Sequence, residues 1–348
     1  MINKFTISDS CVVEYFCGEK KSDKICVTFT ERGNRTLGGL GFGGEFLRNQ
    51  GFDIVAVKNI DDTCWYQNID AMCVDFIKSI TKQYSLACGY GSSMGGYAAI
   101  RFAAELELQN VFAISPLYDI RFDWDRRHES DANQIKSAMM HKCFISNNCN
   151  YFIAYDSKSQ DARHFDEYYK IIDSSKIFAI RAPYAGHPVG PFLNAIGELV
   201  NIAVSILNGR GEPCWTSAGK KRRSKDYLYN ISQYCMIIEK YDISLKINNI
   251  LIDTHKADAL WFIQRCKILM NLQRSDEAIP EGLRAIEMSP INHHMRAYVC
   301  LTMAKLGRVD EALQLIDQGI ERGADSSALA RVRDGVLAMR DQIVRSRA

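Results

Sequence analysis

The sequence predicts two domains of different class: an α/β domain built on a doubly wound, mostly parallel sheet, and an all-α domain of helical repeats after it. In the first part of the chain, apolar runs typical of buried strands alternate with helical patterns. In the last third, short motifs recur at a regular spacing. We therefore expect an α/β domain over residues 1–207, a basic linker over 208–223, and helical repeats with a capping helix over 224–348.

The segment 91–95, Gly-Ser-Ser-Met-Gly, has the G-x-S-x-G form of a nucleophile elbow. It follows the apolar run 84–88 and leads into a helical pattern over 96–102, which is the strand–turn–helix context that this motif requires. The turn is so tight that only very small residues fit beside the serine, and it lifts the serine oxygen clear of the sheet edge. An ordinary glycine-rich loop does not explain three glycines around one serine. We expect Ser93 to be a nucleophile.

A serine nucleophile needs a histidine base, and that histidine needs a carboxylate to orient it. In proteins with this elbow the order along the chain is serine, acid, histidine. His187 fits this order, because it lies in the turn-rich loop Pro-Tyr-Ala-Gly-His-Pro at 183–188, after the strand-like run 177–180 and before a helical pattern over 192–203. We expect His187 to be the base.

The acid has several candidates. Asp156 and Asp161 both follow the strand-like run 151–155, and Asp161 is favoured because the acid usually lies a few residues beyond the strand end. Asp119 is a weaker third candidate. Asp161 and His164 also have the i, i+3 spacing of a local surface contact on a helix. The aspartate that is not the acid is expected to form a turn, since aspartate readily hydrogen-bonds nearby backbone.

An oxyanion hole is expected at the backbone N–H of Met94, the residue after the nucleophile. A second N–H should come from the loop after the early strand 25–29, at Thr30, Glu31 or Arg32. We assign it to Glu31, in the middle of these three.

Residues 1–207 resemble the α/β-hydrolase superfamily. The stretch Gly-Ser-Ser-Met-Gly-Gly-Tyr-Ala-Ala at 91–99 and Trp-Tyr-Gln at 65–67 resemble a bacterial esterase-like group associated with making or modifying surface glycans. The resemblance implies hydrolysis of a carboxylic ester, or O-acyl transfer, through an acyl-enzyme on Ser93, with glycan-linked acyl groups as a candidate substrate. The alternative from a different class is a non-catalytic scaffold that acts through its helical repeats. Substrate size should depend on the segment 118–150, which we expect to form a cap.

The segment 39–44 matches G-x-G-x-x-G, the dinucleotide-binding fingerprint. That fingerprint requires its first glycine at a strand end, and here polar and turn-forming residues separate the glycine from the strand ending at Phe29. We therefore interpret it as a flexible loop near the active-site rim and expect no cofactor.

Composition and charge argue against several other classes of protein. A net charge of +2 gives no reason to expect nucleic-acid binding, and no apolar run is long enough to predict membrane insertion. The start of the chain lacks the apolar stretch of a signal peptide. The 12 cysteines are scattered without a C-x-x-C pair, so we expect reduced thiols, no metal site and a cytoplasmic protein.

The last third resembles tetratricopeptide repeats. Asp-Glu-Ala at 276–278 recurs at 310–312, and this offset equals the period of the tetratricopeptide repeat. Repeats are expected to begin near residues 224, 258 and 292, with a capping helix over 327–345. Small Ala278 and Ala312 should let the helices approach closely. The resemblance implies binding of a protein partner or self-association. The basic run at 220–225 is expected to be a solvated connector.

Overall fold

The computed structural model describes residues 2–18, 22–135 and 139–347. The chain divides into two compact units, Met1–Tyr227 (unit 1) and Leu228–Ala348 (unit 2). The segment 208–223, predicted to be a basic linker, is largely exposed or half-buried but contacts the rest of unit 1. Trp215 lies against the unit 1 core, and the Lys220 ammonium forms an ion pair with Glu198.

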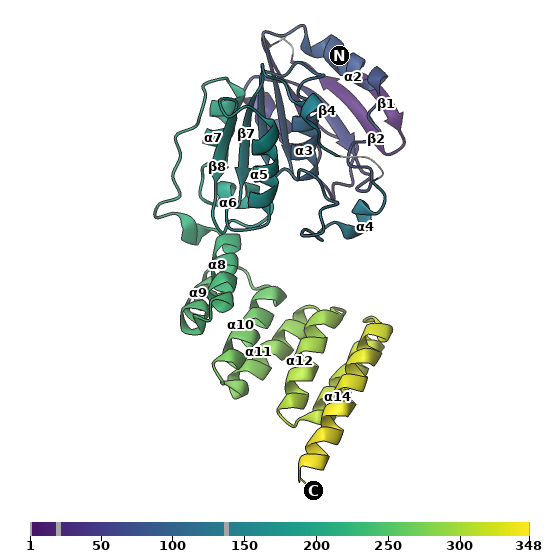
Figure 1. The fold of residues 1–348 in the computed structure, drawn as a ribbon, viewed down its shortest axis with the longest axis vertical. Coiled ribbons are helices and arrows are strands. Elements are labelled where there is room, and N and C mark those ends of the chain that lie inside the picture. The colour runs from purple at the N-terminus through teal and green to yellow at the C-terminus, as the bar shows by residue number, and fades with distance from the viewer. Residues whose placement is uncertain (1, 19–21, 136–138, 348) are drawn as a thin grey trace. The chain divides into compact units, whose positions relative to one another are not determined.

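Unit 1 is built on an eight-stranded sheet with the strand order β1-β2-β4-β3-β5-β6-β7-β8. Figure 1 shows this sheet with β1 and β2 toward one side and β7 and β8 toward the other. Strand β2 runs antiparallel to its neighbours β1 and β4, and all other neighbouring strands are parallel. The strands are β1 (Ile2–Ser8), β2 (Cys11–Phe16), β3 (Lys24–Phe29), β4 (Asp53–Asn59), β5 (Leu86–Ser92), β6 (Asn110–Ile114), β7 (Asn150–Tyr155) and β8 (Ile177–Arg181). The central parallel strands are almost wholly buried, as expected for strands covered on both faces.

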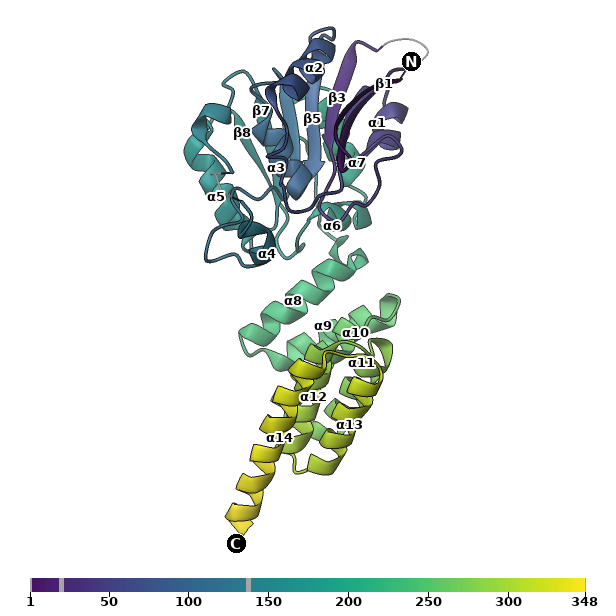
Figure 2. The same ribbon diagram turned by 90° about the vertical axis from the view of Figure 1, so that its right-hand side faces the viewer.

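Helices cover both faces of this sheet (Figure 2). Successive strand residues point to opposite faces, so Val27 belongs to one core and Cys26 to the other. One face is covered by α2 (Ala71–Thr81), α3 (Met94–Arg101) and α5 (Asp161–Ile171), and the other by α1 (Gly44–Asn49), α6 (Gly190–Ala195) and α7 (Leu199–Leu207). The shorter elements are α4 (Glu129–Ala132), η1 (Lys142–Phe144) and η2 (Lys221–Arg223). The single helical pattern predicted over 192–203 is in fact two helices, because Gly197 adopts a positive φ of 77° between them.

The parallel strands place their carboxyl ends at one edge of the sheet. The residues that follow β3, β5, β7 and β8 are therefore gathered at that edge, although they lie far apart in the sequence. This is the edge where open α/β sheets bind ligands.

Unit 2 consists of helix pairs. They are α8 (Lys225–Ile237) with α9 (Tyr241–Thr254), α10 (Ala259–Asn271) with α11 (Ser275–Met288), and α12 (His293–Lys305) with α13 (Val309–Glu321), followed by α14 (Ser326–Arg347). The first of these helices, α8, begins three residues before Leu228. The first helices of the pairs begin at 225, 259 and 293 and the second at 241, 275 and 309, so both series advance by the same constant step. Ala278 and Ala312 are fully buried, as close helix packing requires. The predicted fold class, a doubly wound α/β sheet followed by helical repeats, is confirmed. In the described part of the chain, every helix is too short or too polar to span a bilayer.

Candidate active site

Ser93 lies in a strained turn between β5 and α3. Its φ of 52° and ψ of −114° are unfavourable for a residue with a side chain. The neighbouring glycines are required by space, because a Cβ on Gly91 would lie 2.3 Å from the Gly95 carbonyl oxygen, and one on Gly95 would lie 2.2 Å from the Phe29 carbonyl oxygen. The G-x-S-x-G pattern thus reflects close approach of three backbone segments around Ser93.

Ser93, His187 and Asp161 form one continuous chain of hydrogen bonds. The Ser93 Oγ lies 2.9 Å from His187 Nε2, and His187 Nδ1 lies 2.9 Å from Asp161 Oδ2. An ionised carboxylate can only accept, so the Asp161 contact places the histidine proton on Nδ1. Nε2 is then free to accept the proton of the serine hydroxyl. The structure brings together the three residues that the sequence selected for this role.

Asp161 is held by a second group, the Arg127 guanidinium. Arg127 Nη1 donates to Asp161 Oδ1 at 2.8 Å, and its Nε donates to Asp125 Oδ1 at 2.9 Å. Burial opposes ionisation of Asp161, but the hydrogen bonds and charges of His187 and Arg127 outweigh it, so the pKa of Asp161 stays below its ordinary value. This carboxylate is ionised at neutral pH.

His164 is not a surface partner of Asp161, and the suggested local contact is wrong. The His164 side chain is 0% exposed, and its Nε2 lies 2.9 Å from Asp125 Oδ2. Its Nδ1 accepts the Tyr118 N–H at 3.1 Å, which places the ring proton on Nε2, facing Asp125. The helix α5 therefore presents Asp161 and His164 to two different partners.

Asp156 accepts hydrogen bonds from backbone N–H groups of its own turn and of the loop that carries His187. Its carboxylate accepts the backbone N–H groups of Lys158 and Tyr184 at 2.8 Å and of Gly186 at 2.9 Å. Two of these three donors belong to the loop that carries His187, so Asp156 holds that loop. Asp119 instead accepts from Arg121 Nε at 2.9 Å.

The loop after β3 lies directly against the start of α3. A Cβ on Gly95 would meet the Phe29 and Thr30 carbonyl oxygens at 2.2 and 2.9 Å. The Thr30 N–H is already used, because it donates to the Val57 carbonyl at 3.2 Å. Of the three candidates for the second oxyanion donor, Glu31 and Arg32 remain, and the assignments to Met94 and Glu31 stay predictions.

Sequence reasoning missed a polar cluster beside this loop. Arg32 Nε donates to Asp131 Oδ2 at 2.8 Å, and Trp65 Nε1 donates to the same oxygen at 3.3 Å. The His128 ring packs edge-on against Trp65, with 5.3 Å between ring centroids. Both His128 and Asp131 lie in the segment 118–150, of which 136–138 fall outside the described residues. This segment has no motif that would mark these residues in advance.

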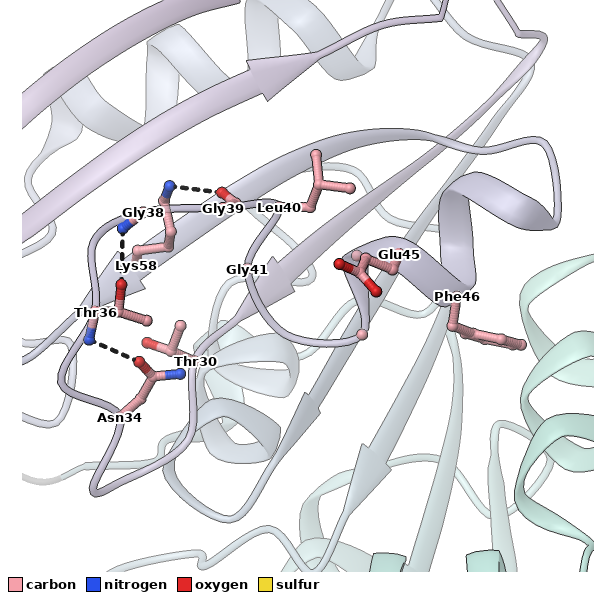
Figure 3. Close-up of a pocket in the computed structure, with 12 residues that line it drawn as sticks. Thr30, Asn34, Thr36, Gly38, Gly39, Leu40, Gly41, Glu45, Phe46 and Lys58 are labelled. Carbon is pink, nitrogen blue, oxygen red and sulfur yellow. Dashed lines mark hydrogen bonds between the residues drawn. The ribbon is translucent and has the colours of Figure 1, made fainter.

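The glycine-rich segment 38–44 lines a pocket of about 340 Å³ (Figure 3). Thr30 and Lys58, near the carboxyl ends of β3 and β4, line the same pocket. Lys58 is 1% exposed, forms an ion pair with Glu14 and donates to the Gly39 carbonyl at 2.9 Å. These contacts tie the segment to the sheet. Through Thr30 the pocket adjoins the loop beside Ser93.

Comparison of the sequence with protein families and with curated proteins finds no match. Among solved structures, the chain is similar to a sugar hydrolase (YeeB) from Lactococcus lactis, at 12% identity over 52% of this chain and 82% of that one, with a TM-score of 0.39. It is similar to the capsule O-acetyltransferase of Neisseria meningitidis serogroup A, at 15% identity over 52% and 86%, with a TM-score of 0.38. It is also similar to YrrB, a TPR protein with an unusual peptide-binding site, at 18% identity over 35% and 68%, with a TM-score of 0.27. Likeness at this level assigns no activity to the chain.

Proposed function

We propose that this protein is a serine esterase of the α/β-hydrolase type, acting on a carboxylic ester through an acyl-enzyme. The observation that carries the proposal is the chain of hydrogen bonds from Ser93 through His187 to Asp161, at 2.9 Å for each link. Its nucleophile lies in the strained turn at the start of α3, where the helix N-terminus favours developing negative charge. A scaffold that kept the fold as structure alone would not need this geometry.

In the proposed reaction, the Ser93 oxygen attacks the ester carbonyl carbon while its proton passes to Nε2 of His187. The N–H groups of Met94 and Glu31 stabilise the resulting oxyanion. The bond from the carbonyl carbon to the alcohol oxygen then breaks, and His187 returns the proton to that oxygen. The acyl group remains on Ser93. A water molecule loses a proton to His187, attacks the acyl carbon and releases the carboxylic acid, and the proton returns to Ser93.

The acyl-enzyme can also be resolved by an alcohol in place of water. Attack by a sugar hydroxyl follows the same proton path and yields an O-acyl sugar, so the same residues support hydrolysis and O-acyl transfer. We propose glycan-linked O-acyl esters as the substrate class.

We further propose that unit 2 binds a protein partner or a second copy of the chain. Stacked helical repeats commonly present a binding surface. Large apolar side chains are exposed on them, including Ile237 at 70% and Ile291 at 65%. The proposed location is the cytoplasm, which is supported by the cysteines, all of which are free thiols.

Labelling with a fluorophosphonate probe tests the proposed enzyme class. The probe should attach to Ser93 in the intact protein, as located by mass spectrometry of the digested chain, and heating the protein beforehand should abolish labelling. Phenyl esters of short acids should be hydrolysed by the same preparation. A folded protein that neither reacts with the probe nor hydrolyses an ester would favour the scaffold alternative.

A further inference from the structure

Trp65 and Tyr66 form a strained turn in the core of unit 1. Both have a positive φ, of 45° and 60°, which residues with large side chains rarely adopt, and both side chains are buried. A backbone of this kind costs free energy, persists only where surrounding contacts hold it, and is found most often at functional sites. The contacts of the turn therefore point to the group that it positions.

The Tyr66 side chain is fixed against the end of β3. Its ring packs edge-on against the ring of Phe29, the last residue of that strand, with 5.6 Å between ring centroids. Its hydroxyl donates to the Thr30 carbonyl at 2.8 Å and lies 3.0 Å from Thr30 Oγ1. Burial raises the pKa of Tyr66 well above its ordinary value, so the hydroxyl keeps its proton and remains a donor at neutral pH.

Thr30 is held through each of its polar groups. Its N–H donates to the Val57 carbonyl at 3.2 Å, and its hydroxyl donates to the Asn59 carbonyl, also at 3.2 Å. The Thr30 Oγ1 in turn accepts the Asn59 N–H at 3.0 Å. Because the carbonyl accepts from Tyr66, this residue cannot rotate without losing at least one of these hydrogen bonds.

The Thr30 carbonyl and the Glu31 N–H belong to one peptide group. A peptide group is planar, and in the trans form its C=O and N–H point in opposite directions. The hydrogen bond from Tyr66 to the carbonyl therefore fixes the direction of the Glu31 N–H. This peptide lies beside the start of α3, since a Cβ on Gly95 would lie 2.9 Å from the Thr30 carbonyl oxygen. Gly95 directly follows Met94, the other predicted oxyanion donor.

We propose that Tyr66 is a positioning residue for the oxyanion hole, because its hydroxyl holds the Thr30–Glu31 peptide with the Glu31 N–H facing the oxyanion that forms when Ser93 attacks. The inference rests on the proposed esterase function and adds a residue to its mechanism. Donors that are already in place stabilise an oxyanion better than mobile ones, since no reorganisation is needed during the reaction. Tyr66 acts through the peptide and does not contact the reacting atoms.

The test is Tyr66→Phe, which removes the hydroxyl and keeps the ring. We expect kcat for p-nitrophenyl acetate to fall by about 10- to 100-fold, which is less than for loss of a whole oxyanion donor, because the Glu31 N–H is still present but no longer held. KM should stay within about twofold of the wild-type value, since the oxyanion exists only after the bound ester is attacked. The matched control is Tyr168→Phe, because the buried Tyr168 hydroxyl also donates to a backbone carbonyl, that of Leu117, at 3.2 Å. It should keep the wild-type kcat.

A second readout is inhibition by phenyl trifluoromethyl ketone. The Ser93 oxygen adds to its carbonyl carbon, the serine proton passes to His187, and the ketone oxygen becomes an alkoxide in the position of the oxyanion. The inhibition constant should rise in Tyr66→Phe by about the factor by which kcat/KM falls. It should stay unchanged in Tyr168→Phe, whereas the melting temperatures of the two variants should be lowered by similar amounts.

Three results would overturn the inference. The kcat and the inhibition constant could be unchanged in Tyr66→Phe, or Tyr168→Phe could lose as much kcat as Tyr66→Phe. Tyr66→Phe could also fail to fold under conditions in which Tyr168→Phe folds, and Tyr66 would then support the fold itself. Failure of the proposed function looks different, because the wild type would then show neither labelling of Ser93 nor turnover of the ester.

Discussion

The charged network beside Ser93 in unit 1 differs in burial from the repeated ion pairs of unit 2. In unit 1, carboxylates are buried at one edge of the sheet, where the Asp125 and Asp161 side chains are 2% and 1% exposed and share one arginine. In unit 2, the pairs Arg274–Glu277 and Arg308–Glu311 lie on the surface at equivalent repeat positions, and their glutamates are 57% and 55% exposed. The surface pairs are local and repeat with the fold, whereas the buried network joins residues distant in sequence and occurs at one place.

Burial of charge alone does not mark a functional site, as Arg296 in unit 2 shows. Its side chain is almost fully buried, but its guanidinium donates to the carbonyls of Leu315 at 2.7 Å and Pro290 at 2.8 Å. It therefore binds backbone groups of its own unit, which is a structural role. The unit 1 network differs because it ends on a serine hydroxyl aimed at a histidine nitrogen. In the proposed reaction, the buried charge there supports the nucleophile.

The largest expected effect is that of Ser93→Ala. Removal of the attacking oxygen should lower kcat for p-nitrophenyl acetate by roughly 10⁴-fold or more, because the acyl-enzyme can no longer form. The matched control is Ser92→Ala, the adjacent serine at the end of β5, which should keep most of the activity. Circular dichroism should show both variants folded. Comparable turnover in Ser93→Ala and the wild type would refute the assignment of the nucleophile.

Asp161→Asn should come next, with a loss of about 10³- to 10⁴-fold in kcat, since an amide facing Nδ1 favours the wrong histidine tautomer. Asp156→Asn should have a smaller effect, because Asp156 holds the loop of His187 through backbone N–H groups and does not face the ring. Steady-state kinetics on the same ester measure both. The reverse ranking would transfer the role of the acid to Asp156, and two mild effects would bring Asp119 back into consideration.

The sequence indicated Ser93 as the nucleophile through its G-x-S-x-G motif, and Asp161 and His187 as its partners through their order along the chain and their place after strand-like runs. The repeats were equally predictable, since the recurrence of Asp-Glu-Ala at a fixed offset is visible without knowing any contact. Both signals are local patterns of residues along the chain.

No pattern in the sequence indicated the arginines that hold the carboxylates around the site. Arg127 reaches Asp161, and Arg32 reaches Asp131, across long stretches of intervening chain. These contacts depend on how an irregular segment folds over the sheet edge, which a pattern of apolar residues does not encode. The contact of Trp215 with the core was missed for a related reason, because the basic composition of 208–223 indicated a solvated connector.

Arg127→Met and Arg308→Met compare a buried ion pair with an exposed one. At pH 7, Arg127→Met should lower the free energy of unfolding by about 2–3 kcal/mol, which is below the usual range for a buried pair because the Arg127 side chain keeps 27% exposure. The change in the free energy of unfolding caused by Arg308→Met should lie within experimental error, because exposed ion pairs contribute little. Urea unfolding followed by tryptophan fluorescence measures both. Equal losses of unfolding free energy in the two variants would show that the buried ion pair contributes no more than the exposed one.

The pH dependence of the free energy of unfolding tests the same comparison in a second way. Asp125 and Asp161 have pKa values below their ordinary ones in the folded protein, despite burial, because of hydrogen bonds and charges from His164, His187 and Arg127. Their stabilising contribution is therefore present above the unfolded pKa of about 4 and is lost as the pH falls toward the folded values. Arg127→Met raises both pKa values, so its stability should fall less steeply than that of the wild type between about pH 5 and pH 2. A parallel acid profile would show that Arg127 does not hold these carboxylates ionised.

The smallest expected effect on catalysis is that of removing unit 2. A chain ending at Tyr227 contains Ser93, His187 and Asp161 and should hydrolyse p-nitrophenyl acetate within about threefold of the full-length rate, because repeats of this kind bind partners and supply no chemistry. A chain ending at Leu207 is the informative comparison. It lacks Trp215 and Tyr227, which pack on the unit 1 core, so it should expose apolar surface and aggregate in light scattering. If the shorter chain were soluble and equally active, the segment 208–227 would be a linker after all. If the longer chain were folded but inactive, unit 1 would need unit 2 for activity. The two units would then differ in how they are stabilised but would not have separate functions.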